Sequence, residues 1–280
     1  MPTQSSPSAK RFTAVVLAGD RTPHDPVARA SGVCCKALSP IGGRAMILRV
    51  LDALGQAQSV AARVLCGPPK HALEQNPELR AGIEAGHWSW LENEATPSRS
   101  AYRAMQSLGT DVAILLTTAD HALLRKEIVD DFCARALRSD CDLVVALVPY
   151  DRVMATHPAV RRTGWRFRDG SYCGCNLYAF VRPPARRVAE LWRRVEQDRK
   201  RPWRVVRLLG WGSVLRFLMG RLTLGEAIER LSNRLEVRIG HVLLPFPEAA
   251  VDVDTLADWE YVSALLESRT DDAARAPQDS

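Results

Sequence analysis

The stretch "AVVLAGDRTP", Ala14 to Pro23, passes from an apolar run directly into glycine, an acid and a base. The β-branched run predicts a buried strand over residues 12–18, and Gly19 marks the point where that strand enters a loop. In an open α/β sheet, ligands bind beyond the carboxyl ends of strands, where a loop glycine lets backbone N–H groups approach phosphate oxygens. The turn is therefore a candidate phosphate-binding loop, although a ligand-free turn also explains a single glycine.

Strands and helices alternate along the first two-thirds of the chain. Further strand-like runs are "AARVLC", "DVAILLTT" and "DLVVALV", at residues 61–66, 111–118 and 142–148. Segments with helical spacing lie between the runs, at residues 45–56, 98–108 and 126–137. This alternation predicts a three-layer α/β/α fold with a mostly parallel, doubly wound sheet.

The last third has a different pattern. Strands are expected at residues 164–170, 174–180 and 238–246, and helices at residues 183–197 and 223–235. Thr223 and Glu226 have the spacing of a capping box, which predicts that the second of these helices begins there. We expect one domain over residues 11–268, with a basic helical insertion at 199–235 and polar, disordered tails at 1–10 and 269–280.

Charge and cysteine content set broad limits. The formal net charge is +6, from 38 basic and 32 acidic residues, which is a mild excess suited to an anionic ligand. We do not expect nucleic acid as the partner. The seven cysteines have no disulfide-like spacing, and residues 1–10 are polar and precede an apolar run too short for a secretion signal. These features predict a cytoplasmic protein.

Lys36 stands seventeen positions after Gly19 and precedes a Pro/Gly turn and an amphipathic helix. Together, "VVLAGDR" and "KALSPIGGRAMILRVLDAL" resemble the N-terminal signature of the sugar-phosphate and cofactor nucleotidyltransferases, especially those similar to the molybdenum-cofactor nucleotidyltransferases. The resemblance implies the nucleotide-diphospho-sugar transferase (GT-A) type of fold. It also implies that the loop wraps a nucleoside triphosphate while the lysine contacts its phosphates. The residues that inherit these roles are Leu17, Ala18, Gly19, Arg21 and Lys36.

Later segments extend the resemblance over roughly residues 12–266. "TPSRSAYRAM" resembles the segment that approaches base and ribose, which makes Ser100 a candidate, and Asn176 resembles an asparagine placed near the acceptor. "ILLTTADHALL" resembles the strand that ends in a metal-binding aspartate, here Asp120. "VDVDTLADWEYV" resembles the closing motif, which implies Asp254 as the second metal ligand and makes Asp252 a further candidate metal ligand.

The loop departs from the family pattern at several points. Asp20 replaces the second glycine and adds a negative charge to the set of residues expected around the triphosphate. Cys35 stands where a proline normally precedes the lysine, and the residues "TPHDPVARASGVC" lengthen the loop. A non-catalytic member of the family therefore stays open as an interpretation.

The chemistry of nucleotidyl transfer agrees with these residues. An anionic phosphate must attack the α-phosphorus of the triphosphate while cations hold the charge. Mg²⁺ prefers oxygen ligands and takes one or two carboxylates besides phosphates and water. Lys36, Asp120 and Asp254 are therefore the expected catalytic residues, with Mg²⁺ as cofactor. As the alternative, each of the two aspartates is a helix N-cap.

Residues 200–222 form a basic stretch rich in tryptophan and leucine. Its arginines interrupt the apolar run, which argues against a membrane-spanning helix. The composition of this stretch fits contact with an anionic membrane surface, at the inner face of the membrane. It also fits a pocket for a lipid-linked acceptor. A helical insertion that packs on the sheet is the simpler alternative.

Taken together, the residues predict a Mg²⁺-dependent nucleotidyltransferase that acts on a phosphorylated acceptor, either a small molecule or lipid-linked. Two other classes stay open. "DVD" at 252–254 is compatible with a GT-A-type glycosyltransferase, and the basic insertion with a non-catalytic nucleotide- or nucleic-acid-binding module. Pyrophosphate release that needs Mg²⁺ distinguishes the enzyme, whereas RNA binding predicts an affinity that falls steeply with salt.

Overall fold

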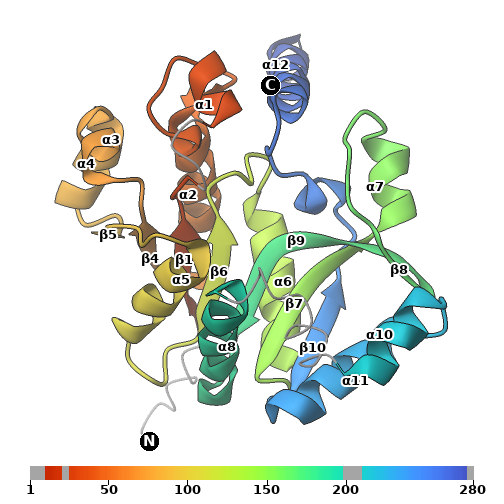
Figure 1. Cartoon of the computed structure of the whole chain (residues 1–280). Coiled ribbons are helices and arrows are strands. Elements are labelled where there is room, and N and C mark those ends of the chain that lie inside the picture. Colours follow the sequence, from red (N-terminus) through yellow and green to blue (C-terminus); the bar gives the residue numbers. More distant parts are fainter. Residues whose placement is uncertain (1–9, 21–24, 198–209, 276–280) are drawn as a thin grey trace, which may run out of the picture.

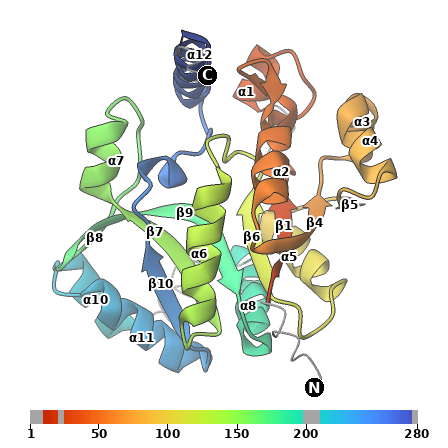
Figure 2. The same cartoon turned by 180° about the vertical axis from the view of Figure 1, so that it is seen from behind.

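The computed structural model describes residues 10–20, 25–197 and 210–275, and these form one large sheet covered by helices on both faces (Figures 1 and 2). The sheet order is β10-β7-β9-β6-β1-β4-β5, and β8 pairs with β9. The strands are β1 (Phe12–Leu17), β4 (Val60–Cys66), β5 (Ser89–Leu91), β6 (Ile114–Thr118), β7 (Leu143–Pro149), β8 (Trp165–Phe167), β9 (Gly170–Phe180) and β10 (Ile239–Leu243). Only β9 and β8 run antiparallel to their neighbours within this described sheet.

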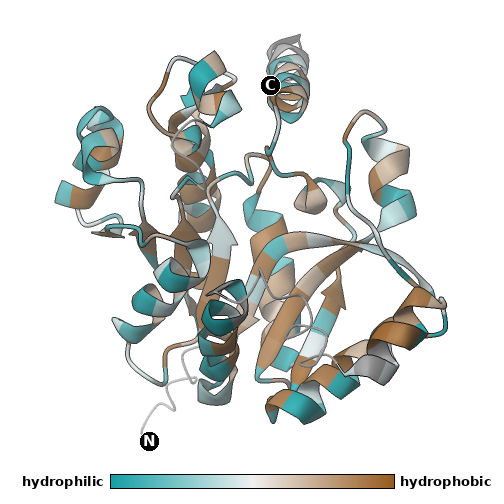
Figure 3. Ribbon diagram, in the orientation of Figure 1, coloured by the Kyte–Doolittle hydropathy of each residue, from teal (hydrophilic) through white to brown (hydrophobic). Residues whose placement is uncertain are grey.

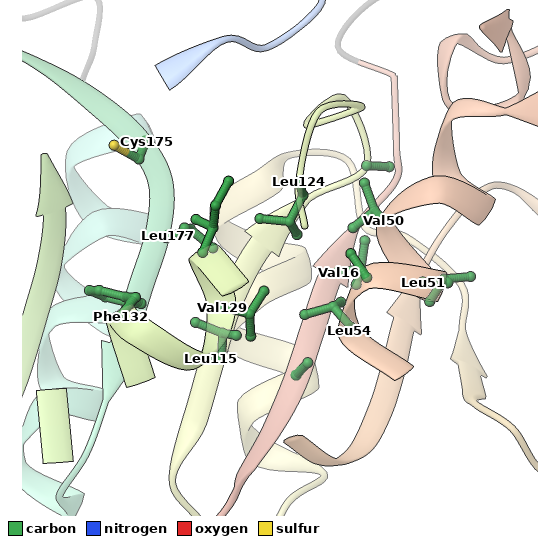
Figure 4. Close-up of a cluster of buried hydrophobic side chains, with 14 of the residues drawn as sticks. Val16, Val50, Leu51, Leu54, Leu115, Leu124, Val129, Phe132, Cys175 and Leu177 are labelled. Carbon is green, nitrogen blue, oxygen red and sulfur yellow. The ribbon is translucent and has the colours of Figure 1, made fainter. Parts of the chain in front are cut away.

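Strand β1 shows how the two faces of the sheet are built. Its residues are buried throughout, and alternate side chains enter two different apolar clusters. Ala14 and Val16 pack toward α2 (Met46–Gln56) and α6 (Lys126–Arg138). Figure 4 shows Val16 and Leu115 of the sheet close to side chains of these helices, among them Val50, Leu54, Val129 and Phe132. This continuous apolar run is typical of a parallel strand covered on both sides.

The opposite face carries the second cluster, which contains Val15 and Leu17. It is covered by α5 (Pro97–Gln106), α8 (Arg186–Gln197) and α11 (Leu224–Leu235). The predicted three-layer α/β/α arrangement is therefore confirmed.

Three further helices, α1 (Pro26–Ala30), α7 (Tyr150–Thr156) and α12 (Leu256–Arg275), lie above one edge of the sheet, at the top of Figure 1. A small third cluster joins α1 and α12 through side chains such as Val27 and Val262. The remaining helices among the described residues are α3 (Lys70–Glu74), α4 (Pro77–Glu84) and α10 (Trp211–Leu218). Short elements are the hairpin β2 (Pro40–Ile41) and β3 (Arg44–Ala45), and the 3₁₀ turns η1 (Lys36–Leu38), η2 (Pro183–Ala185) and η3 (Pro247–Ala250).

The expected elements are present with small shifts at their ends. The run at 111–118 pairs as a strand only from Ile114, and the helix expected from residue 183 begins with the 3₁₀ turn η2. The capping box is confirmed: the Thr223 hydroxyl accepts from the Glu226 N–H at 3.1 Å, and the Glu226 carboxylate accepts from the Thr223 N–H at 3.0 Å.

The structure describes only parts of the expected insertion and of the two expected tails. The insertion expected at 199–235 contains α10 and α11, whereas residues 199–209 lie outside the described residues, as do residues 1–9 of the first tail. Helix α12 continues to Arg275, into the range 269–280 expected to be a tail. No helix among the described residues is long and apolar enough to cross a bilayer.

Candidate active site

The carboxyl ends of β1 and β6 open into a cavity of about 450 Å³. These parallel neighbours pair Leu17 with Thr118, so the residues that follow them leave the sheet at the same edge. Of the residues expected in the site, the following line the cavity: Leu17, Ala18, Gly19, Asp20, Lys36, Ser100, Asp120, Asn176 and Asp254. Arg21, also expected there, lies outside the described residues.

Gly19 turns the chain where there is little room for a side chain. A Cβ atom at this position would lie 3.0 Å from the Asn93 amide nitrogen, which is tighter than most real contacts. The Ala18 N–H donates to the Cys66 carbonyl of β4 at 2.8 Å and so continues the sheet pairing up to the turn. The glycine therefore allows the close packing of the β1 loop against the loop that follows β5.

Asp20 holds the segment that carries Lys36. Both of its carboxylate oxygens accept from the Lys36 backbone N–H at 3.1 Å, and the Cys35 thiol donates to one of them at 3.5 Å. Burial raises the pKa of Asp20 above its ordinary value. The acid that replaces the family's second glycine is thus a local anchor for the lysine as well as a charge beside the cavity.

The Lys36 ammonium joins two distant parts of the chain. Its Nζ lies 3.0 Å from Asp120 Oδ2 and 3.3 Å from Asp254 Oδ1, and it donates to the Val253 carbonyl at 3.0 Å. Burial lowers the pKa of Lys36, but the two carboxylates raise it further, so the net direction is upward. Burial works against the charged form of Asp120, yet the charge and hydrogen bonding around it, chiefly from Lys36, bring its pKa below the ordinary value. Lys36 and Asp120 are therefore both charged at neutral pH.

Neither aspartate caps a helix. Helix α6 begins six residues after Asp120, with Arg125 at its N-cap. At the start of α12, Thr255 takes the capping position: its hydroxyl accepts from the Asp258 N–H at 3.2 Å, and the Asp258 carboxylate accepts from the Thr255 N–H at 2.9 Å. The Asp254 side chain, 47% exposed, is left for Lys36 and the cavity.

Asp252 is placed differently from the other two aspartates. It pairs with Arg162, whose side chain is 11% exposed, and accepts from the Asn176 amide at 2.8 Å, and it does not line the cavity. Asn176 does line it and has a left-handed backbone with φ of 49°. Asp252 is therefore bound to Asn176, the residue expected near the acceptor, and Lys36 does not contact Asp252. Sequence reasoning missed Arg162, because no local pattern distinguishes it from a surface arginine.

Ser100 lines the cavity and holds the backbone of Glu94, another lining residue. The side chain is only 3% exposed, and its hydroxyl accepts from the Glu94 N–H at 2.8 Å. The Glu94 carboxylate in turn pairs with Arg103 at 2.8 Å and lines the cavity. Glu94 was not anticipated from the sequence.

Helix α8 supplies another unanticipated part of the wall. Trp192, 36% exposed, lines the cavity beside Tyr178 of β9. The Glu196 carboxylate accepts from both the hydroxyl and the N–H of Ser98, in the first turn of α5. The Arg193 guanidinium lies 4.4 Å from the centre of the Tyr102 ring. These contacts attach α8 to α5, so that the tryptophan is held in place.

The carboxylates fit a single magnesium ion that also binds phosphate. Among the described residues there is no group of three or more acidic, histidine or cysteine side chains able to hold a metal by itself. However, Asp120 Oδ1 is buried without a hydrogen-bond partner, and Asp254 is half exposed beside it. One or two carboxylates are the usual protein contribution to a Mg²⁺ site completed by phosphates and water.

The chain is similar to known proteins over most of its length. The model of the MobA-like NTP transferase domain matches residues 14–231. A hypothetical transferase from Thermus thermophilus is 31% identical, with a TM-score of 0.73 over 89% of this chain and 99% of its own. No curated protein matches the chain.

Two more distant structures share the fold. One is 4-diphosphocytidyl-2C-methyl-D-erythritol synthase from Anaerococcus prevotii, at 13% identity and a TM-score of 0.57, over 92% of this chain and 96% of its own. The other is CMP:2-keto-3-deoxy-manno-octonic acid synthetase in complex with CTP, at 15% identity and a TM-score of 0.54, over 93% of this chain and all of its own. Since the family model covers most of the sequence, the chain belongs to the family of the MobA-like NTP transferase domain and is an enzyme of the nucleotidyltransferase kind.

Proposed function

We propose that this protein transfers a nucleoside monophosphate from a nucleoside triphosphate to a phosphorylated acceptor, with Mg²⁺, and releases pyrophosphate. The observation that carries the proposal is the position of the Lys36 ammonium, between Asp120 and Asp254 in the wall of the cavity that Gly19 also lines. In the reaction, an acceptor phosphate oxygen bonds to the α-phosphorus, and the bond from the α-phosphorus to the bridging oxygen breaks as pyrophosphate leaves.

The balance of charge supports a divalent ion. Asp20, Asp120 and Asp254 border the cavity, and Lys36 is their cationic neighbour. A triphosphate beside three carboxylates is repelled unless further positive charge is bound with it. Asp120 and Asp254 would hold Mg²⁺, which neutralises phosphate charge and orients the phosphates when bound.

The chain's own residues have separate roles in this proposal. Gly19 lets the backbone approach the phosphates, and Lys36 contacts them as a compact positive charge. The wall formed by Glu94 and Ser100 lies on the side expected for base and ribose, and Asn176 faces the acceptor. The held position of Lys36 orients the reactants, which is the main contribution that a protein makes to phosphoryl-type transfer.

The alternatives make different predictions. A glycosyltransferase would use a sugar nucleotide and release no pyrophosphate, and a binding module would bind nucleotide without turnover. A lipid-linked acceptor and membrane contact through residues 200–222 are part of the proposal, and of that range the structure describes residues 210–222.

A pyrophosphate-release screen tests the function. The four nucleoside triphosphates are each combined with phosphorylated alcohols, sugars and cofactor precursors, with and without Mg²⁺. Asp120→Asn and Asp254→Asn should abolish release and weaken Mn²⁺ binding measured by electron paramagnetic resonance. Asp140→Asn is the matched control, because that carboxylate is 91% exposed and remote from the cavity lining. Full release by a folded Asp120→Asn protein would remove this residue from the mechanism.

A further inference from the structure

Exposed apolar side chains gather at one corner of the molecule. Large exposed hydrophobic residues are few among the described residues, and four of them lie on β8, on α10 or at the C-cap of α10: Trp165 (57% exposed), Leu215 (58%), Leu218 (75%) and Met219 (48%). We name these four side chains the apolar corner. Figure 1 places β8 beside α10, and Figure 3 shows hydrophobic residues along α10 there. A cluster of this kind on a soluble domain marks a contact surface.

Helix α10 has two distinct faces. Leu215, Leu218 and Met219 have the i, i+3, i+4 spacing that places side chains on one side of a helix. On another side, the Phe217 ring packs against Phe167 of β8 with centroids 5.4 Å apart. Phe217 therefore supplies packing on the protein, whereas Leu215, Leu218 and Met219 are exposed within the part of the chain that the structure describes.

The helix is fixed to the domain, so its outward face has a defined direction. The Arg168 N–H donates to the Leu222 carbonyl at 2.9 Å, which joins the end of β8 to the chain just after α10. Arg216 of α10 pairs with Glu226 of α11 at 3.0 Å. These contacts hold α10, and with it the apolar corner, in a fixed position on the domain.

Charge around the corner is basic on its outer side. The nearby acids have internal partners: Asp169 accepts from the Leu224 N–H at 3.0 Å, and Glu226 caps α11 and pairs with Arg216. Arg166 and Arg221 are exposed, and neither pairs with an acid within the part of the chain that the structure describes. Exposed arginines next to exposed leucines match the chemistry of a bilayer surface with anionic head groups.

We propose that the apolar corner is a membrane-binding surface that lies on an anionic bilayer. Leu215, Leu218 and Met219 enter the boundary between head groups and acyl chains, while Arg166 and Arg221 contact lipid phosphates. A two-fold contact with a second copy fits less well, because such a contact brings the same patch of each copy together, arginines included.

The corner also has a fixed relation to the cavity. Trp165 pairs with Tyr172 of β9, and Asn176, which lines the cavity, follows four residues later on the same strand. Four strand residues span about 13 Å. A lipid-borne acceptor head group at the membrane is therefore within reach of the site. This consequence rests on the proposed nucleotidyl transfer, whereas binding to a membrane can be measured without that reaction.

Vesicle co-sedimentation tests the surface with the full chain. The probe is phosphatidylcholine vesicles with about one third phosphatidylglycerol, compared with vesicles of phosphatidylcholine alone. The double variant Leu215→Ser/Leu218→Ser should lower the partition coefficient at least about tenfold. The control is Leu243→Ser, which alters a leucine that is 38% exposed on β10. Arg221→Glu should weaken binding, whereas Arg80→Glu, on α4 at the other end of the molecule, should not.

Circular dichroism and pyrophosphate release on a water-soluble acceptor verify that each variant is folded and active. Loss of vesicle binding with retained release supports the surface independently of the transfer reaction. Equal vesicle binding by the wild type and the double leucine variant overturns the proposal. The proposal is also overturned if the wild type does not bind vesicles but forms a dimer, and the leucine substitutions dissociate that dimer.

Discussion

The contact between Lys36 and Asp120 permits a quantitative test by a double-mutant cycle. Their side chains are 16% and 15% exposed, so the pair is mostly withdrawn from water, and Nζ lies 3.0 Å from Oδ2. Removing one partner from a buried pair costs roughly 3–5 kcal/mol, and partial exposure reduces this to about 2–4 kcal/mol. We therefore expect Lys36→Met to lower the free energy of unfolding by about 2–4 kcal/mol.

The double variants compare the coupling energy of Lys36 with Asp120 and with Asp254. In the Lys36→Met/Asp120→Asn variant no unpaired charge remains at this contact, so the coupling energy should be about 1–2 kcal/mol. The corresponding coupling with Asp254 should be below about 1 kcal/mol, because that carboxylate is 47% exposed and screened by water. Urea unfolding without divalent cations measures each variant.

The pH range of the coupling follows from the pKa directions. Asp120 has a lowered pKa, so its contribution is present above the ordinary carboxylate range and is lost as the pH falls through the lowered value. Lys36 has a raised pKa, so its contribution is present below the ordinary lysine range and is lost as the pH rises through the raised value. The coupling should therefore be flat between about pH 5 and 9. Additivity of the Lys36 and Asp120 substitutions within about 0.5 kcal/mol would refute the reasoning.

Three further predictions concern the surroundings of the site. Burial lowers the pKa of His121 to about 4, so its neutral form favours folding above its ordinary pKa of 6.5 and that stability is lost as the pH falls toward 4. Wild type should lose about 2 kcal/mol more than His121→Gln between about pH 7 and 5 in urea unfolding, and equal losses would contradict this. Asp20→Gly should cost about 1–2 kcal/mol of stability and raise the KM for nucleotide, because the anchor of Lys36 is lost. Higher activity at unchanged stability would instead identify Asp20 as a repelling charge. Gly67→Ala should destabilise the protein by about 1–3 kcal/mol, because φ at Gly67 is +87° and a Cβ would lie 3.0 Å from the Ala18 carbonyl carbon. Thermal unfolding measures this, and an unchanged midpoint would count against the packing.

Local sequence was sufficient for the parts of the fold that depend on short-range patterns. The apolar run of β1 and the capping box of α11 carry their structural signal within a few residues, and both are present. Gly19, Lys36 and Asp120 could be brought to one sheet edge because parallel strands end together. The role of Asp254 followed from the family resemblance, and its contact with Lys36 agrees with that placement.

Other parts of the site depend on long-range packing and have no local signature. The approach of Arg162 to Asp252 joins residues ninety positions apart, and nothing in the nearby sequence selects that arginine. Likewise, Trp192 lines the cavity from α8, which Glu196 and Arg193 attach to the distant helix α5. An amphipathic pattern locates such a helix on the sheet, but it does not specify which residue faces the ligand.

The contact of Lys36 with the segment that begins α12 has a consequence for biosynthesis. The Val253 carbonyl and the Asp254 carboxylate both receive the ammonium, and they are translated after β10, the final strand of the described sheet. A nascent chain can therefore pair every one of those strands while Lys36 still lacks two of its three acceptors. On the ribosome, the segment containing Asp254 leaves the exit tunnel after β10, so the last two contacts of Lys36 form only after all of these strands are available for pairing.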